Sequence, residues 1–186
     1  MPFGESEKQS RRSLYKIDDP FVRLWFRVVA PHRGRLAAGS RATRLAILDR
    51  FWAELAAQSW EDLCRKRLPQ VEPSSPLGAS GPWGLAPRWW RGNAPEWDVV
   101  SESMDGTRLL LGEAGWSGRP LGAAALQRAG REVAARSAPE LPARYSRHES
   151  LRALLVPETT AAGRDGAEKE GVIVVTADRL IGSRSG

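Results

Sequence analysis

Acidic side chains fall at positions where the fold would bring several of them together. Asp98 lies in the second of three short extended segments and Glu113 ends the third, with the strong hairpin dipeptide Asp105-Gly106 between them. Counting back along this hairpin makes Asp98 and Glu113 near neighbours, and alternation lets them share a face. Glu96 points the same way, and Glu61, late in a long helical segment, is within reach of that face.

Carboxylates that converge repel one another unless a cation neutralises them, and oxygen ligands of this kind suit Mg²⁺ or Mn²⁺. Such a cation can orient water and stabilise charge at a scissile phosphate. The spacing therefore offers Asp98 and Glu113 as metal ligands, and Glu61, Asp98 and Glu113 as a catalytic set. Acidic residues near strand ends also occur in α/β domains that bind no metal, so the spacing alone leaves both interpretations open.

The helices and strands that must position these carboxylates follow from the spacing of apolar residues and from the Pro and Gly residues that end such elements. Asp18-Asp19-Pro20 is a helix start, because a carboxylate cap precedes a proline whose missing N–H is not needed in the first turn. Helices are expected at 20–30, 41–68 and 121–136, strands at 88–91, 97–100, 108–113, 152–156 and 172–176, and loops at 69–87 and 163–171. This order predicts an α/β fold, a mixed sheet flanked by helices and preceded by a helical N-terminal segment.

Two apolar sets are expected to be buried. One is a stripe along the long helix, formed by Leu45, Leu48, Trp52, Leu55, Ser59 and Leu63. The other is the pair Trp25 and Phe26 in the first helix, which we interpret as core residues.

Charge is distributed unevenly along the chain. Residues 1–50 hold 11 Lys or Arg and 5 Asp or Glu, whereas residues 51–186 hold 17 of each kind, so all of the net charge of +6 lies in the first quarter. A basic stretch of this kind suits phosphates, and Arg23, Arg27 and Arg33 are its candidate DNA contacts. Solvated helix faces would explain the same arginines equally well.

Composition excludes several protein classes. The single cysteine, Cys64, rules out an internal disulfide and a Cys-rich zinc site and is expected to be a small buried hydrophobe. No apolar run approaches the roughly 18 residues that a membrane span needs. We therefore expect a reduced, cytoplasmic protein that does not cross a membrane.

The order of Glu61, Asp98 and Glu113 on helix, strand and strand is similar to the PD-(D/E)XK nuclease fold. The segment 13–31, SLYKIDDPFVRLWFRVVAP, resembles more closely the C-terminal domain of archaeal-type DEXX-box ATPases. Four later stretches resemble that family too: WEDLCR at 60–65, RWWRG at 88–92, EWDVV at 96–100 and LGEAGW at 111–116. The resemblance runs from about residue 2 to residue 180.

In that family an ATPase core and a winged helix precede this domain. The resemblance thus implies that residues 1–17 are a remnant of a winged-helix hairpin, 18–40 a helical linker and 41–182 the PD-(D/E)XK-like domain. The chain has no Gly-x-x-x-x-Gly-Lys-Ser/Thr loop to hold ATP phosphates, so an ATPase part would be missing or encoded elsewhere.

The nuclease pattern is interrupted at one position. Gly115 stands where the family has the lysine of Glu-x-Lys, and residues 67–168 contain no other lysine. Arg119 or Arg128 would supply charge, yet a guanidinium is a poor proton shuttle at neutral pH. We expect a catalytically degraded accessory domain of a DEXX-box-type ATPase that associates with DNA. The alternatives are an active Mg²⁺-dependent DNA nuclease and a protein-interaction module that docks on a separate ATPase.

Overall fold

The computed structural model describes residues 3–4, 17–160, 168 and 170–182. The expected winged-helix remnant at 1–17 and the expected surface loop at 163–171 therefore lie mostly outside the described residues. Within them, the predicted α/β architecture is confirmed: a mixed sheet is flanked by helices, and a helical segment precedes it.

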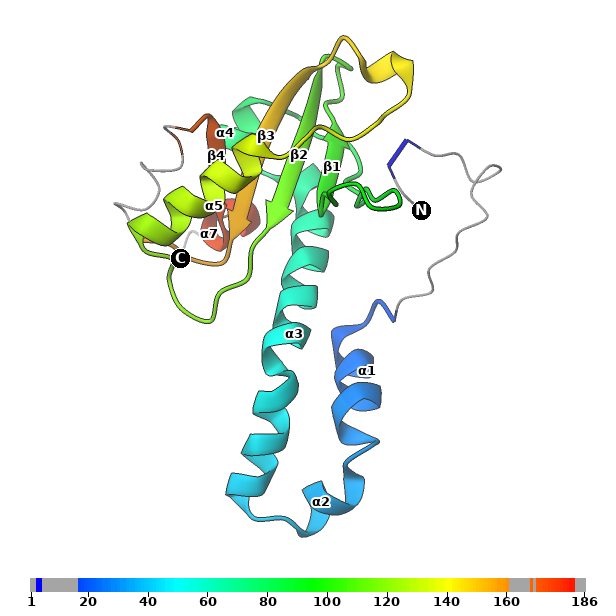
Figure 1. Cartoon of the computed structure of the whole chain (residues 1–186), viewed down its shortest axis with the longest axis vertical. Coiled ribbons are helices and arrows are strands. Elements are labelled where there is room, and N and C mark those ends of the chain that lie inside the picture. The colour runs from blue at the N-terminus through cyan, green and yellow to red at the C-terminus, as the bar shows by residue number, and fades with distance from the viewer. Residues whose placement is uncertain (1–2, 5–16, 161–167, 169, 183–186) are drawn as a thin grey trace.

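The N-terminal helical segment and the first half of the long helix α3 lie side by side and together form an arm (Figure 1). The segment comprises α1 (Pro20–Leu24), a π-helical turn (Trp25–Val29) and α2 (Arg33–Ala38), and α3 spans Arg41–Arg67. The helix start at Asp19-Pro20 is confirmed, since an Asp19 carboxylate oxygen accepts the N–H of Val22 at 2.9 Å. A small core of Val28, Ile47 and Leu55 holds the arm together.

The two expectations about buried residues in this region are wrong in part. Trp25 and Phe26 are 39% and 61% exposed, and Leu45 and Trp52 of the expected stripe are also exposed. The first half of α3 projects from the sheet, so only the side that faces α1 and α2 is covered (Figure 1). The π-helical turn also rotates its residues away from the i, i+4 positions of a regular helix.

The sheet contains four strands in the order β1 (Val99–Glu102), β2 (Arg108–Ala114), β3 (Glu149–Val156) and β4 (Val172–Thr176). β1 is antiparallel to β2, whereas β2, β3 and β4 are parallel. The helix α5 (Ala123–Ala135) makes the expected crossover between β2 and β3. The expected strand at 88–91 is reduced to one bridge, between Trp89 and Trp97.

Helices cover both faces of the sheet, as alternation along its strands requires. Leu110 and Leu155 pack with the C-terminal half of α3 and with α7 (Ala177–Ile181) on one face. Leu111 and Leu154 pack with α5 on the other face. Cys64 is fully buried on the α3 face, as expected, and burial raises the pKa of its thiol. Short helices at Leu68–Gln70, Pro76–Ala79 and Ala143–Tyr145 occupy the connections.

Among the described residues, no helix has both the length and the apolar character required to cross a membrane.

Asp105 organises the turn between β1 and β2. Its Oδ1 atom accepts hydrogen bonds from the Ser103 hydroxyl at 2.6 Å and from the Thr107 N–H and hydroxyl at 3.1 and 2.8 Å. Gly106 follows with a φ of 69°, a conformation that favours glycine. The bonds from Ser103 and Thr107 lower the pKa of Asp105 from 3.8 to about 2.

Because the pKa of Asp105 is lower in the folded chain than in the unfolded chain, its ionised form stabilises the fold above the unfolded value. This stabilisation is lost as the pH falls through the folded value. We expect Asp105→Asn to be less stable than the wild type at neutral pH, and the difference to shrink as the pH falls and to vanish below about 2. Urea unfolding across a pH series measures this difference. A difference that does not change with pH would contradict the prediction.

Candidate functional site

Asp98 and Glu113 lie opposite each other where β1 and β2 adjoin. Val99 pairs with Gly112 in the antiparallel register, so Asp98 and Glu113 form the next opposed pair. The Oδ2 atom of Asp98 accepts the backbone N–H of Ala114 at 3.0 Å. The proximity expected from the hairpin is present in the structure, and both side chains line a pocket of about 320 Å³.

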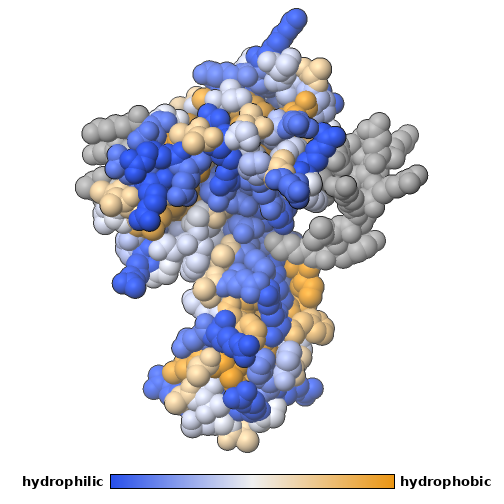
Figure 2. All heavy atoms as spheres, in the orientation of Figure 1, coloured by the Kyte–Doolittle hydropathy of each residue, from blue (hydrophilic) through white to orange (hydrophobic). Residues whose placement is uncertain are grey.

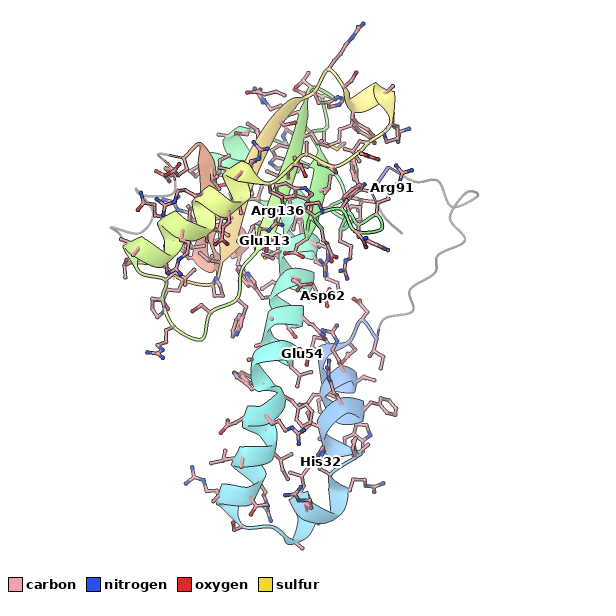
Figure 3. The ribbon with its side chains drawn as sticks, in the orientation of Figure 1. His32, Glu54, Asp62, Arg91, Glu113 and Arg136 are labelled. Atoms are coloured by element: carbon pink, nitrogen blue, oxygen red, sulfur yellow. The ribbon has the colours of Figure 1, made fainter. Side chains whose placement is uncertain are left out.

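The pocket also contains Arg136, which no motif in the sequence singles out. Arg136 follows directly after α5, and its Nη1 donates to Glu113 Oε2 at 2.6 Å and to the carbonyl of Glu96 at 2.7 Å. Its guanidinium carbon lies 5.0 Å from the ring centre of Trp97. Figure 3 shows Glu113 and Arg136 next to each other between the sheet and α5. Three contacts thus fix this guanidinium against the Glu113 carboxylate.

The protonation of Glu113 reflects opposing influences. Burial, the largest cause, raises the pKa of its carboxyl group, and the neighbouring Asp98 carboxylate raises it further. The hydrogen bond from Arg136 and its positive charge act in the opposite direction, without reversing the shift. The site therefore holds two acidic groups that a single guanidinium only partly neutralises.

Two of the expected acidic residues do not join this pair. Glu61 lies on α3, which covers the opposite face of the sheet from α5, and its carboxylate is 3.6 Å from Arg65. Glu96 lines the pocket, yet its carboxylate pairs with Arg88. In the described part of the chain, no three Asp, Glu, His or Cys side chains gather as metal ligands. The expected set of Glu61, Asp98 and Glu113 is thus not assembled around one point.

The residues at the pocket do not fit a divalent cation in this arrangement. Mg²⁺ and Mn²⁺ need several oxygen ligands, whereas Glu113 already accepts a guanidinium N–H and Asp98 accepts a backbone N–H. A cation beside the Arg136 guanidinium would also be repelled by it. The Mg²⁺ or Mn²⁺ expected from the sequence remains a prediction, and the geometry gives it no support.

Position 115 faces the same side of the sheet as Glu113. A Cβ atom built on Gly115 would lie 3.6 Å from Val156 and 3.7 Å from Leu154, which are ordinary contacts. Gly115 therefore leaves room for a side chain, and the lysine of the nuclease pattern is absent for reasons other than backbone geometry. Neither Arg119 nor Arg128 lines the pocket; Arg136 does.

The three arginines proposed as DNA contacts have different surroundings. Arg23 is buried and donates to an Asp62 carboxylate oxygen at 2.7 Å and to the Ile17 carbonyl at 2.9 Å. Arg23 therefore packs α1 against α3. The prediction that Arg23 contacts DNA is wrong, because its guanidinium is buried against Asp62. Arg27 pairs with Glu54 at 2.5 Å, and Arg33 is exposed. Figure 3 shows Glu54 and Asp62 on α3.

The far end of the arm carries an exposed group of arginines, which we name the arginine tip: Arg33, Arg35, Arg41, Arg44 and Arg50. Among the described residues, no carboxylate forms an ion pair with any of the five. Figure 2 shows hydrophilic patches at this end of the arm. A groove of about 520 Å³ lies between the arm and the connection that follows β2, and it is lined by apolar side chains such as Phe21 and Trp52 of the arm and Trp116 of that connection.

Comparisons with known proteins give a family and one distant structure. The sequence model of the DUF234 family, described as Archaea bacterial proteins of unknown function, matches residues 25–129. No curated protein matches the chain. A solved structure titled as an EndoMS–dsDNA2 complex is similar at a TM-score of 0.37 and 17% identity, over 67% of this chain and 44% of that chain. This chain thus spans less than half the length of that structure.

Asp62 and Glu54 allow a matched test of the two ion pairs in the arm. The Arg23–Asp62 side chains are 7% and 12% exposed, whereas those of Arg27–Glu54 are 38% and 53% exposed. We expect Asp62→Ala to destabilise the protein by about 3–5 kcal/mol, because it leaves a buried guanidinium without a carboxylate. Glu54→Ala is the control and should change stability by no more than about 1 kcal/mol. Urea unfolding measures both values, and equal effects would contradict this account of the arm.

Proposed function

The chain belongs to the DUF234 family, and on that premise we propose that it is a nuclease-like accessory domain that associates with DNA and does not cleave it. The observation that carries the proposal is the arginine tip, a group of exposed cations without carboxylate partners among the described residues. Cleavage and association are separate parts of this proposal, and each has its own support.

DNA association is supported by the charge and placement of the tip. Guanidinium groups make bidentate contacts with phosphate oxygens, and sequence-independent binding depends mainly on such contacts. Arg41 and Arg44 lie in the first turn of α3, where the positive end of the helix dipole disfavours cations and favours anions. These cations do not favour the dipole of α3, although Arg44 also donates to the carbonyls of Gly39 at 3.1 Å and Ala37 at 3.3 Å at the end of α2. A positive group at this helix end suits an anionic partner. Arg33 is the one residue of the original three that belongs to this surface.

Absence of cleavage is supported by the pocket. Nuclease chemistry in the PD-(D/E)XK pattern uses a cation held by carboxylates and a lysine that positions or activates water. Here Gly115 replaces the lysine, and the Glu113 carboxylate is held by Arg136. A guanidinium remains protonated at neutral pH, so Arg136 does not act as a general base.

The link to an ATPase is supported by the resemblance of residues 13–31 and of the four later stretches to the C-terminal domain of DEXX-box ATPases. We propose that the chain acts with such an ATPase, whether as part of a longer protein or on a separate chain.

Docking on a protein is a second candidate function, which the apolar groove of the arm favours. Phe21 is 68% exposed and Trp52 is 55% exposed, and aromatic side chains of this kind are typical anchors at protein interfaces. The partner in this alternative is the ATPase module, and the salt dependence described next separates it from DNA association.

We expect the affinity for duplex DNA to fall as salt rises, with a slope of about −0.9 in log K against log salt for each phosphate contact. Arg33→Glu with Arg41→Glu should weaken binding and make the slope shallower by up to about 1.8, because two contacts are lost. Fluorescence anisotropy with labelled duplex DNA over a NaCl series measures both quantities.

The control is Arg128→Glu with Arg131→Glu, which changes net charge equally on the exposed side of α5. This variant should keep the wild-type slope. Equal effects of the two variants would show that net charge matters and the tip does not. An affinity that does not depend on salt would favour the protein-docking alternative.

The missing lysine can be restored at Gly115, where a side chain fits. We expect the wild type to leave supercoiled plasmid intact with Mg²⁺ or Mn²⁺, and Gly115→Lys to show weak Mn²⁺-dependent nicking at most. A catalytic site must hold its reacting groups to within about 0.5 Å. Selection does not preserve that geometry once the lysine is lost. Gel analysis of plasmid relaxation measures the activity.

Asp98→Ala is added to each protein as the control. Strong cleavage by the wild type that disappears in Asp98→Ala would overturn the non-cleaving part of the proposal. Nicking that persists when Gly115→Lys is combined with Asp98→Ala would come from a contaminating nuclease.

A further inference from the structure

Asp98 and Glu113 place two acidic side chains in hydrogen-bond contact across adjacent strands, and two ionised carboxylates at this separation would repel each other. Arg136 supplies a positive charge to Glu113 over 2.6 Å from within the same chain. The Arg136 and Glu113 side chains are 21% and 31% exposed, so the pair is partly shielded from water and its attraction is stronger than that of a surface pair.

The guanidinium of Arg136 is held on several sides. Nη1 also donates to the Glu96 carbonyl, and the guanidinium stacks near the Trp97 ring. Behind it, the backbone carbonyl of Arg136 accepts an N–H from Arg152 on β3 at 3.0 Å. Trp97 is itself fixed by donation from its Nε1 to the Ser137 carbonyl at 3.2 Å. These contacts fix the position of the guanidinium, whereas a surface arginine without them would rotate freely.

We propose that Arg136 is a built-in substitute for a divalent cation, and that its removal would expose a latent metal site formed by Asp98 and Glu113. Without the guanidinium, the pocket would be lined by the Asp98 and Glu113 carboxyl groups, which hydrogen bond to each other, and by the Glu96 carbonyl that Arg136 now engages. These are hard oxygen donors, and the pocket leaves space for water ligands. The inference concerns metal binding alone and does not depend on DNA association.

The test measures Mn²⁺ binding directly, by loss of the free Mn²⁺ signal in electron paramagnetic resonance, and by thermal unfolding. Wild type should bind no Mn²⁺ through Asp98 at millimolar concentration. Arg136→Met keeps apolar packing on Trp97 and removes the charge, and it should bind about one Mn²⁺ per chain. At tenfold excess over its dissociation constant, Mn²⁺ should raise the melting temperature of this variant by about 3–6 °C.

Two control variants test whether the Mn²⁺ binding gained by Arg136→Met depends on this arginine and on Asp98. Arg91→Met removes an arginine from an exposed pair with Glu140 and should gain no site. Arg136→Met combined with Asp98→Ala should lose the gain. Asp98-dependent Mn²⁺ binding by the wild type, equal to that of Arg136→Met, would overturn the proposal because Arg136 would then block nothing. A folded Arg136→Met that binds no more Mn²⁺ than the wild type would overturn it as well. If Arg136→Met fails to fold, Arg136→Gln serves in the same comparison.

Discussion

The carboxylate of Asp62 connects the two parts of this molecule. One oxygen accepts a hydrogen bond from buried Arg23 of α1, and the other accepts one from Arg65 at 2.6 Å. Arg65 in turn donates to the backbone carbonyl of Asp98 at 3.0 Å. A chain of charge-assisted bonds thus runs from α1, through α3, to Asp98, which directly precedes β1. Because its members are largely buried, it holds the arm and the sheet in one arrangement.

Acidic and basic side chains also pair at the pocket, but there the positive charge is too small to balance the acidic groups. At Asp62 two guanidiniums surround one carboxylate, whereas at the pocket one guanidinium serves two acidic groups. The raised pKa of Glu113 reflects this incomplete compensation, to which burial contributes most. Under the proposal that the chain does not cleave DNA, a site that is acidic, partly buried and already supplied with an internal cation serves the structure of the protein. The glycine at position 115 is in agreement with that interpretation.

The arm presents two kinds of surface that the sheet does not. The arginine tip lies at its far end, and the apolar groove with Phe21, Trp52 and Trp116 lies nearer the sheet. Both depend on the length of α3, whose first half extends beyond the sheet and carries α1 and α2 with it (Figure 1). DNA and a protein partner would therefore contact different parts of the arm, and neither contact requires the pocket.

Local features of this protein could be predicted from its sequence, because they depend on residues close together in the chain. Asp19-Pro20 begins α1, the long helix ends at Arg67, one residue before the expected end, and strands lie at the expected segments 108–113, 152–156 and 172–176. The opposition of Asp98 and Glu113 belongs to this group, since a short hairpin turn determines its register.

Other features depended on how distant elements pack. Glu61 is separated from Glu113 because α3 and α5 cover opposite faces of the sheet, which no spacing reveals. Burial of Arg23 and exposure of Phe26 depend on which side of α1 meets α3. Arg136 reaches Glu113 across 23 residues of sequence, and only the crossover of α5 brings them together. Side chains that approach through tertiary packing leave no periodic pattern in the sequence, so the tertiary structure alone decided the charge balance of the site.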